Sequence, residues 1–343
     1  MGTEGMQALT QAQAVAHYEA MDLRARPATL HPGYVAADAS RDPRLLPTYL
    51  LYQAQGQRWL HSLHLTAIPG TDLKDASSPY GYGGPLSTSD DARFLAQAWQ
   101  ACSQWMVQQR VVVDYVRFHP VLGNERWYGG SASDNREVVV MDLQGADFAL
   151  AYPPRLKQTL KKAQRAGLVY RETALAPHAR SFGAYYRSAM ADIEADPFFL
   201  FGDAYFELLA ATGLATLGAC QRAGDADGPW LAASVFLQGR GLREYHLAAT
   251  TAQGREVGAS SFLLHEAALA ARALGVPRLY LGGGSNPRPD NSLLFFKSSY
   301  SGRRLLYRTG SSVFRAADYD ELKRRFAADW SAHPERPIFY RKV

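Results

Sequence analysis

The segment 243–284, REYHLAATTAQGREVGASSFLLHEAALAARALGVPRLYLGGG, carries the pattern from which the fold can be inferred. A strand-like run ends near Thr250, a loop bearing Gly254 follows, and a long amphipathic run then extends to about residue 275. A second strand-like run ends in three glycines. Because a helix that crosses between two strands joins neighbours of one sheet, the segment predicts a mixed α/β sheet.

The rest of the chain continues this alternation of strands and helices. Residues 48–69 predict a hairpin around Gly56, residues 76–88 form a loop rich in Pro, Gly and Tyr, and Ser89 or Asp90 is expected to cap the next helix. Composition changes at residues 152–155, so we expect two halves, 1–152 and 153–343. Helices of the second half are expected near 177–192, 202–212, 257–275, 290–299 and 316–327.

Bulk composition indicates a globular protein. The 343 residues are 47% hydrophobic and 20% charged, and no apolar run is long enough to span a membrane. The N-terminal stretch lacks the pattern of a signal peptide, so we expect a cytoplasmic location. Cys102 and Cys220 are far apart in the sequence, which predicts neither a disulfide framework nor a zinc site.

Small residues open the long helix of the segment 243–284. Backbone N–H groups at a helix start bind anions, and Gly258, Ala259 and Ser260 leave room for a phosphate, with Arg255 nearby. The spacing Arg255-x-x-Gly258-x-Ser260 resembles the pyrophosphate loop of GNAT acyltransferases, from which Ser260 departs. The alternative is that these small residues pack against the sheet.

A basic helix is predicted at residues 153–168, PPRLKQTLKKAQRAGL. Lys157, Lys161 and Arg165 lie on one stripe, and no acidic residue interrupts the cluster. Such a patch favours a phosphate-rich partner: RNA, a nucleotide-linked sugar or a lipid-linked diphosphate. The alternative is a solvated helix face.

Two other pairs of polar residues lie on predicted strands. Arg117 and His119 are two residues apart and therefore share a face, which suits either a substrate pocket with His119 as a base or a structural hydrogen-bonded pair. Tyr245 and His246 are adjacent, so their side chains should point to opposite faces. P-loop, nucleophile-elbow and H-E-x-x-H motifs are absent from the sequence.

Several segments in series resemble the FemABX group of acyltransferases, which are peptidoglycan-bridge aminoacyl transferases and their GNAT-like relatives. They cover about residues 45–327 and end in a Gly-Gly-Gly…Asp-x-x-Leu…Phe-Lys pattern. The segments are SPYGYGGPL (78–86), VRFHPVLGN (116–124), VVVMDL (138–143), RLKQTLKKAQRAGL (155–168), YHLAAT (245–250) and LYLGGGSNPRPDNSLLFFKSSYSG (279–302).

The resemblance implies an α/β fold of two packed GNAT-like halves, each a mixed, mostly antiparallel sheet flanked by helices. It implies transfer of an acyl or aminoacyl group from acyl-CoA or aminoacyl-tRNA to an amine or hydroxyl, with no permanently bound cofactor and no metal. The Phe-Lys pair maps onto Phe296 and Lys297, which would contact the donor or stabilise the charged intermediate. The alternative for Lys297 is a helix lysine with its ammonium group in water.

The remaining candidate residues follow from these patterns. Catalytic candidates are Lys297, Tyr245, His246 and Asp196. Donor-binding candidates are Arg255, Gly258, Ala259, Ser260, Phe296, Lys157, Lys161 and Arg165. Acceptor-binding candidates are Tyr80, Tyr82, Arg117, His119, Gly283 and Asn291.

One stretch departs from the group. Residues 189–209 contain five acids and no base, whereas aminoacyl transferases acting on diphosphate-linked precursors carry basic residues there. This departure from the group implies another amine or hydroxyl acceptor, on a cell-envelope precursor, a saccharide or a small metabolite. Asp196 would act as a base, or the acids would cap helices, with Asp203 in an N-cap position. Farther along the chain, Asp290 is expected to cap the helix that carries Lys297. The alternative function is a non-catalytic module that binds RNA or a phosphorylated envelope precursor, and neither reading places a segment within the membrane.

Overall fold

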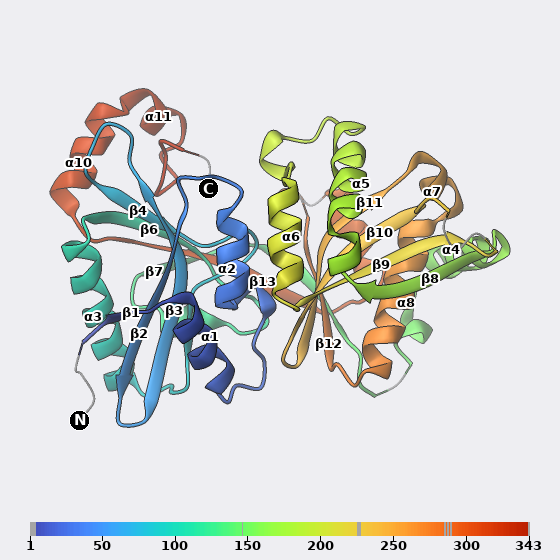
Figure 1. Ribbon diagram of the computed structural model, residues 1–343, viewed down its shortest axis with the longest axis horizontal. Coiled ribbons are helices and arrows are strands. Elements are labelled where there is room, and N and C mark those ends of the chain that lie inside the picture. The colour runs from blue at the N-terminus through green and yellow to red at the C-terminus, as the bar shows by residue number, and fades with distance from the viewer. Residues whose placement is uncertain are drawn as a thin grey trace. The chain divides into compact units, whose positions relative to one another are not determined.

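The computed structural model describes residues 5–145, 147–224, 228–284, 286, 288 and 290–341 (Figure 1). The chain divides into two compact units. Unit 1 comprises Met1–Leu23, Thr29–Asn135 and Tyr307–Val343, and unit 2 comprises Arg24–Ala28 and Arg136–Leu306.

This division differs from the predicted halves, 1–152 and 153–343. The chain leaves unit 1 within strand β7 (Ser131–Asp142) and returns within β13 (Arg304–Val313). The reason is strand pairing: residues of β13 from Thr309 onward pair antiparallel with β6 (Val111–Arg117) and bring the C-terminal segment into unit 1. A local change in composition gives no signal for such a long-range return.

Unit 1 contains a sheet that includes the predicted hairpin. The hairpin strands turn at Gly56, whose φ of 77° lies in the region that favours glycine. The strands of the unit 1 sheet are β1 (Gln7–Ala8), β2 (Leu46–Ala54), β3 (Gln57–Ala67), β4 (Lys74–Ser77), β5 (Pro85–Ser87) and β6. The order is β1-β2-β3-β4-β6-β13, with β5 also paired to β3, and β4 and β6 are parallel neighbours.

The helices of unit 1 include α3 (Ala92–Gln108), which packs on the sheet through Phe94, Ala98, Cys102 and Met106. Its N-cap is Asp91, whose carboxylate accepts from the Phe94 N–H at 2.8 Å. The prediction that Ser89 or Asp90 caps this helix is wrong. The other helices are α1 (Gln11–Ala20), α2 (Pro32–Ala39), α10 (Ala316–Arg325) and α11 (Ala327–Ala332).

The strands of unit 2 also pair in a mixed pattern. Beside β7 these strands are β8 (Leu168–Ala174), β9 (Ala215–Arg222), β10 (Ala232–Gly239), β11 (Leu242–Thr250) and β12 (Arg278–Gly283). The order is β7-β12-β11-β10-β9-β8; β11 and β12 are parallel, and the other neighbours are antiparallel. The crossing predicted for the segment 243–284 is confirmed, since a helix joins the parallel pair.

Helices cover both faces of this sheet (Figure 1). On one face lie α4 (Pro154–Arg165) and α8 (Ala259–Ala273), and on the other lie α5 (Ala179–Ala191) and α6 (Asp203–Ala211). Asp203 is the first residue of α6 and pairs with Arg187, whereas Gly202 occupies the N-cap, so the predicted cap is wrong. Two further helices are α7 (Ala252–Val257) and α9 (Ser292–Ser298).

The predicted fold class is confirmed: each unit has a mixed, mostly antiparallel sheet with flanking helices. Short 3₁₀ segments occur at Ala28–Leu30, Asn124–Trp127, Phe148–Ala151, Ala176–His178 and Pro197–Phe199. No helix within the described ranges combines the length and the apolar character that crossing a membrane requires.

A buried ion pair ties the edge of the unit 2 sheet to its centre. Arg243 on β11 is 1% exposed, and its guanidinium pairs with the Glu172 carboxylate of β8 and donates to Thr216 Oγ1 of β9 at 2.8 Å. It also lies over the ring of Phe236, 4.6 Å from the centroid. Since a buried charge is costly without a partner, Glu172 compensates Arg243.

We therefore expect Glu172→Ala to lower the free energy of unfolding by about 3 kcal/mol, because the variant leaves the Arg243 charge buried and uncompensated. Urea denaturation followed by circular dichroism measures the change. Glu137→Ala is the control, since that side chain is 63% exposed and lies 4.0 Å from Arg304; its effect should stay below about 1 kcal/mol. Equal losses in the two variants would contradict the role given to Glu172.

Candidate active site

The three glycines at the end of β12 allow close packing. A Cβ atom on Gly283 would lie 3.0 Å from the Glu137 carbonyl oxygen, and one on Gly284 would lie 2.4 Å from Asn291 Oδ1. Gly282 has a φ of 76°, a conformation that other residues rarely adopt. The glycines therefore let the strand end approach both β7 and the start of α9.

Asn291 fixes the start of α9. Its Oδ1 accepts from the Leu294 N–H at 3.0 Å, and its Nδ2 donates to Asn286 Oδ1 at 3.1 Å. The cap is therefore Asn291, and the prediction that Asp290 caps this helix is wrong. Pro287 and Pro289 of the predicted turn lie outside the described residues. A contact between Asn291 and an acceptor stays a prediction.

Lys297 lies in the last turn of α9 and reaches back to the end of β12. It is 8% exposed, and its Nζ donates to the Gly283 carbonyl oxygen at 2.8 Å. Arg136 Nη1 donates to the next carbonyl, that of Gly284, at 3.3 Å. The alternative of a lysine with its ammonium group in water is thus wrong, because the side chain points into the protein.

Burial changes the acid–base chemistry of Lys297. It lowers the pKa of the ammonium group from 10.5 to about 7, because the charged form is poorly solvated there. The neutral amine is therefore much easier to reach near neutral pH than in an exposed lysine. An anion at this position would favour the charged form, so the site is suited to stabilising negative charge that appears on a reacting group.

Aromatic side chains surround the Lys297 helix. The ring of Phe296 lies 5.5 Å from that of Tyr300, which lies 5.6 Å from Tyr152. The Tyr300 hydroxyl donates to the Ser261 carbonyl oxygen at 3.0 Å and so joins the segment after α9 to the first turn of α8. Tyr300 was not predicted as a site residue, because a tyrosine three residues from Lys297 is equally typical of a core.

Tyr245 and His246 point to opposite faces, as predicted. Tyr245 packs in the cluster that contains Phe296 and α8, and burial raises its pKa. His246 Nε2 lies 2.6 Å from the hydroxyl of Tyr205 on α6, on the other face. Tyr245 therefore shares the hydrophobic cluster of the Lys297 helix, whereas His246 does not.

The parallel strands β11 and β12 pair over a short length. The ladder joins Arg243 to Leu279 and Glu244 to Tyr280. Beyond it, β12 continues along β7 and β11 continues along β10 as far as Thr250. Both the start of α8 and the Lys297 contact lie beyond the carboxyl ends of these strands, where ligands commonly bind in open α/β sheets.

The segment predicted as a pyrophosphate loop contains the short helix α7. Arg255 Nη1 donates to the Thr250 carbonyl oxygen at 2.9 Å, and the Thr250 and Ser260 hydroxyls lie 2.6 Å apart. A Cβ atom on Gly258 would lie 2.6 Å from Thr159 Cγ2 on α4. Packing of Gly258 against α4 therefore accounts for this glycine, and Ala259 is fully buried.

The basic helix α4 is amphipathic, as predicted. Leu156, Leu160 and Ala163 are buried, and the cations lie on the exposed side. Lys157 Nζ donates to the Leu150 carbonyl oxygen at 2.8 Å, while Lys161 and Arg165 make no hydrogen bond or ion pair with the part of the chain that the structure describes. A polyanion would find these two charges accessible.

Asp196 lies apart from the hydrophobic cluster of the Lys297 helix, in the exposed connection between α5 and α6. Its carboxylate accepts from the Phe198 N–H at 2.8 Å and caps the 3₁₀ segment Pro197–Phe199. This contact matches the helix-capping alternative, and a role as base stays a prediction. Among the described residues, no group of three His, Cys, Asp or Glu side chains is placed to hold a metal ion.

The other acceptor candidates lie in unit 1 and cluster there. The rings of Tyr82 and His119 are 5.1 Å apart, and Tyr82 also contacts Tyr307 at 5.5 Å. His119 is fully buried, and its Nδ1 accepts from the Val121 N–H at 3.3 Å, so this ring nitrogen bonds to the backbone. Arg117 lies over the ring of Tyr115, and Arg41 over that of Tyr80.

Asn124 holds this unit 1 cluster together and was missed in the sequence. It is fully buried; its Oδ1 accepts from the His119 N–H at 2.8 Å, and its Nδ2 donates to the carbonyl oxygens of Gly83 and Pro85. It therefore joins the segments 78–86 and 116–124. Its position in a Gly-Asn turn signal concealed this bridging role.

Several solved structures have a fold similar to that of this chain. FemX aligns with a TM-score of 0.68 at 10% identity, over 93% of this chain and 99% of FemX. The C-terminal domain of a putative lysylphosphatidylglycerol synthetase from Agrobacterium fabrum aligns with a TM-score of 0.59 at 14% identity, over 94% and 97%. L-PGS from Bacillus licheniformis gives 0.58 at 12% identity, over 90% and 94%.

No protein-family model matches the sequence, and no curated protein matches it. The likeness to solved structures therefore rests on the fold. It confirms the resemblance to the FemABX group at that level.

The lowered pKa of Lys297 predicts how the stability of the protein depends on pH. Because the pKa of Lys297 is about 7 in the folded chain and 10.5 in the unfolded chain, the unfolded state binds more protons between these values. Burial of the Lys297 charge therefore lowers the free energy of unfolding most below pH 7, and it has no such effect above pH 10.5. We expect Lys297→Met to raise the free energy of unfolding by about 3 kcal/mol at pH 6–7, with the gain vanishing towards pH 10.5.

Urea denaturation across this pH range measures the effect, and Lys162→Met is the control because Lys162 is exposed on α4. The control should change stability little and without this pH dependence. Destabilisation by Lys297→Met at every pH would show instead that the hydrogen bond to Gly283 outweighs the cost of burial.

Proposed function

We propose that the chain is an acyltransferase that moves an acyl or aminoacyl group to an amine or hydroxyl acceptor, with its catalytic cation in unit 2. The observation that carries this proposal is Lys297, a buried lysine held on the Gly283 carbonyl oxygen with its pKa lowered to about 7. A lysine that costs stability and pairs with no carboxylate among the described residues is typical of a functional site.

The proposed reaction needs a cation beside the carbonyl oxygen of the donor, where negative charge develops. The lone pair of the acceptor nitrogen or oxygen forms a bond to the donor carbonyl carbon, and the C=O electron pair moves to oxygen. The Lys297 ammonium group donates to this oxyanion. When the intermediate collapses, the C=O bond forms again and the bond to the donor sulfur or oxygen breaks. The proton that the acceptor loses passes to this leaving group, which departs as a thiol or a ribose hydroxyl. A preorganised donor of this kind contributes about 10²–10³ in rate.

Aminoacyl-tRNA is the donor that the charges of unit 2 favour. Lys161 and Arg165 are exposed on α4 and available to phosphates, and Arg155 lies beside them over the exposed ring of Phe295. The region that would hold a coenzyme A pyrophosphate is occupied by α7, and its Gly258 packs against α4. Acyl-CoA is the second candidate donor, supported by the small residues at the start of α8.

We infer the class of acceptor from the chemistry of the proposed reaction. One structural neighbour is a putative lysylphosphatidylglycerol synthetase, and that name denotes a lysyl group attached to a phospholipid. An aminoacyl group transferred to a hydroxyl is thus within the proposed reaction. Amine acceptors on a saccharide, an envelope precursor or a small metabolite use the same attack and the same cation.

Loss of the Lys297 cation should slow transfer far more than it weakens donor binding. We expect Lys297→Met to lower the consumption of aminoacyl-tRNA in the presence of a panel of amines and alcohols by about 10²-fold or more. Filter retention of the same tRNA should change less than about threefold. Lys323→Met on α10 is the control, since that lysine pairs with Asp320 in unit 1.

Unchanged consumption in folded Lys297→Met would remove Lys297 from the mechanism. Release of thiol from acetyl-CoA, measured in parallel, separates the two donors. Retention of tRNA without turnover of either donor by the wild-type chain would favour the binding module over the enzyme.

The exposed cations of α4 should govern polyanion binding. We expect the triple variant Lys157→Ala, Lys161→Ala and Arg165→Ala to weaken tRNA binding and to reduce the dependence of log K on log salt concentration by about 1–2. The matched control replaces Lys323, Arg324 and Arg325 on α10, which lies in unit 1. A salt slope that is the same in both variants would identify α4 as a solvated face.

A further inference from the structure

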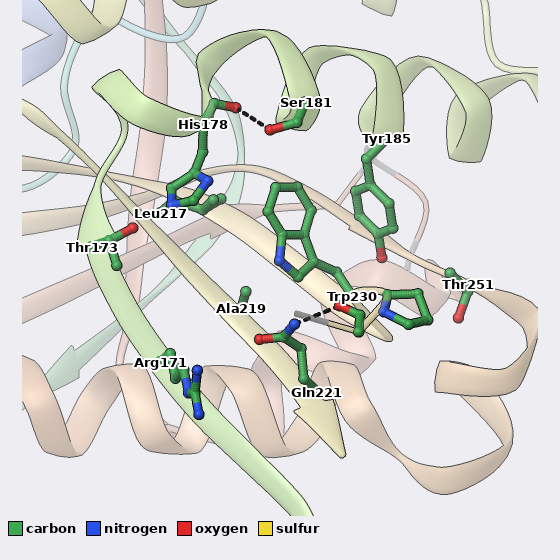
Figure 2. Close-up of a pocket in the computed structure, with 12 residues that line it drawn as sticks. Arg171, Thr173, His178, Ser181, Tyr185, Leu217, Ala219, Gln221, Trp230 and Thr251 are labelled. Atoms are coloured by element: carbon green, nitrogen blue, oxygen red, sulfur yellow. Dashed lines mark hydrogen bonds between the residues drawn. The ribbon is translucent and has the colours of Figure 1, made fainter. Parts of the chain in front are cut away.

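A cavity of about 660 Å³ lies in unit 2, on the face of the sheet that α5 covers (Figure 2). Strands β8 and β9 form its floor, the start of α5 lies over it, and Trp230 enters it from the segment before β10. Its volume falls within the range of small-molecule sites. The proposed transfer reaction makes no use of it.

This cavity lies on the opposite face of the sheet from the hydrophobic cluster under α4 and α8. The reason is that alternate residues of β9 face opposite ways. Leu217, Ala219 and Gln221 line the cavity, whereas Cys220 packs in the cluster of α4 and α8. Phe296 and Tyr245 contact that second cluster. A ligand in the cavity would therefore lie on the opposite face of the sheet from the ring of Phe296.

The cavity has an aromatic wall. The ring of Trp230 lies 5.9 Å from His178 and 5.6 Å from Tyr185, in edge-to-face contact with each (Figure 2). The Tyr185 hydroxyl donates to the Ala249 carbonyl oxygen at 3.2 Å, which fixes that ring against β11. The indole N–H of Trp230 donates to no acceptor within the described ranges. A flat ring system could stack here and still receive a hydrogen bond.

The charge of the cavity favours an anion. Arg171 on β8 lines it and has no hydrogen bond or ion pair with any residue that the structure describes, and none of the described lining residues is acidic. Helix α5 begins at Ala179 with no acidic residue in its first turn and no side-chain cap. Its positive end therefore adds to the charge of Arg171.

We propose that this cavity binds a nucleoside phosphate, with the base against Trp230 and the phosphate at Arg171. A base stacked on an aromatic side chain and a phosphate held by arginine are recurrent contacts, and here both partners line one cavity of suitable volume. The site goes beyond the proposed transfer reaction. The nucleotide is either free or the nucleotide part of a larger molecule such as coenzyme A.

The test uses calorimetry on the whole chain with adenosine 5′-monophosphate, uridine 5′-monophosphate, coenzyme A, adenosine and inorganic phosphate. We expect at least one nucleotide or coenzyme A to bind with one site per chain, tenfold or more tighter than adenosine or phosphate. Tight binding of a mononucleotide identifies a free nucleotide, and tight binding of coenzyme A alone identifies the larger source.

Variants then locate the site. Arg171→Gln and Trp230→Ala should each weaken binding tenfold or more; Arg171 is exposed, so its variant should fold even if Trp230→Ala does not. Arg180→Gln is the matched control, because Arg180 lies in the first turn of α5 and pairs with Glu207 outside the cavity. Lys297→Met should leave nucleotide binding unchanged.

Three results would overturn the proposal: no binding of any nucleotide at millimolar concentration, binding unaffected by Arg171→Gln, or binding lost in Lys297→Met. Equal affinity for inorganic phosphate and for the nucleotides would overturn the assignment of a base to Trp230.

Discussion

The hydrogen bond from the Lys297 ammonium group to the Gly283 carbonyl oxygen is the contact on which the candidate active site depends. To form it, β12 must end in residues without side chains, because Asn291 and the backbone of β7 occupy the space that Cβ atoms would need. Helix α9 must then start close to the strand end, and Asn291 caps it there. The glycines, the cap and the buried lysine therefore act as one arrangement.

Two buried cations of unit 2 illustrate different uses of charge. Arg243 pairs with Glu172 and lies over Phe236, so its charge is compensated and joins β8 to β11. Lys297 has a carbonyl oxygen as its partner, and burial lowers its pKa to about 7. An arginine stays charged in any protein environment, whereas a lysine at this pKa responds to an arriving anion. The first cation supports the sheet, and the second is suited to chemistry.

The sheet of unit 2 presents different chemistry on its two faces. On one face α4 and α8 pack over a cluster that reaches Phe296 and Tyr300, close to Lys297. On the other, α5 and Trp230 enclose a cavity with Arg171 at its wall. Thr251 lines this cavity and caps α7, the helix that leads into α8, so the two faces meet at the end of β11.

The sequence by itself determined the fold class, the crossing between β11 and β12, the basic face of α4 and the candidacy of Lys297. The crossing and the basic face follow from local periodicity and capping residues, which act over a few neighbouring residues. The two-part fold class and the candidacy of Lys297 came from the resemblance to the FemABX group. Helix bounds were predicted well, but Asp91, Gly202 and Asn291 are the caps, because neighbouring polar residues are equivalent in sequence and differ only in backbone geometry.

Only the tertiary structure decided which distant residues meet. The return of β13 to β6, the bridge made by Asn124, the burial of Lys297 and the cavity at Trp230 all depend on contacts between residues far apart in the chain. Burial also set the pKa of Lys297, since desolvation depends on every atom around the ammonium group. A sequence records which groups are present, and only packing determines which of them water can reach.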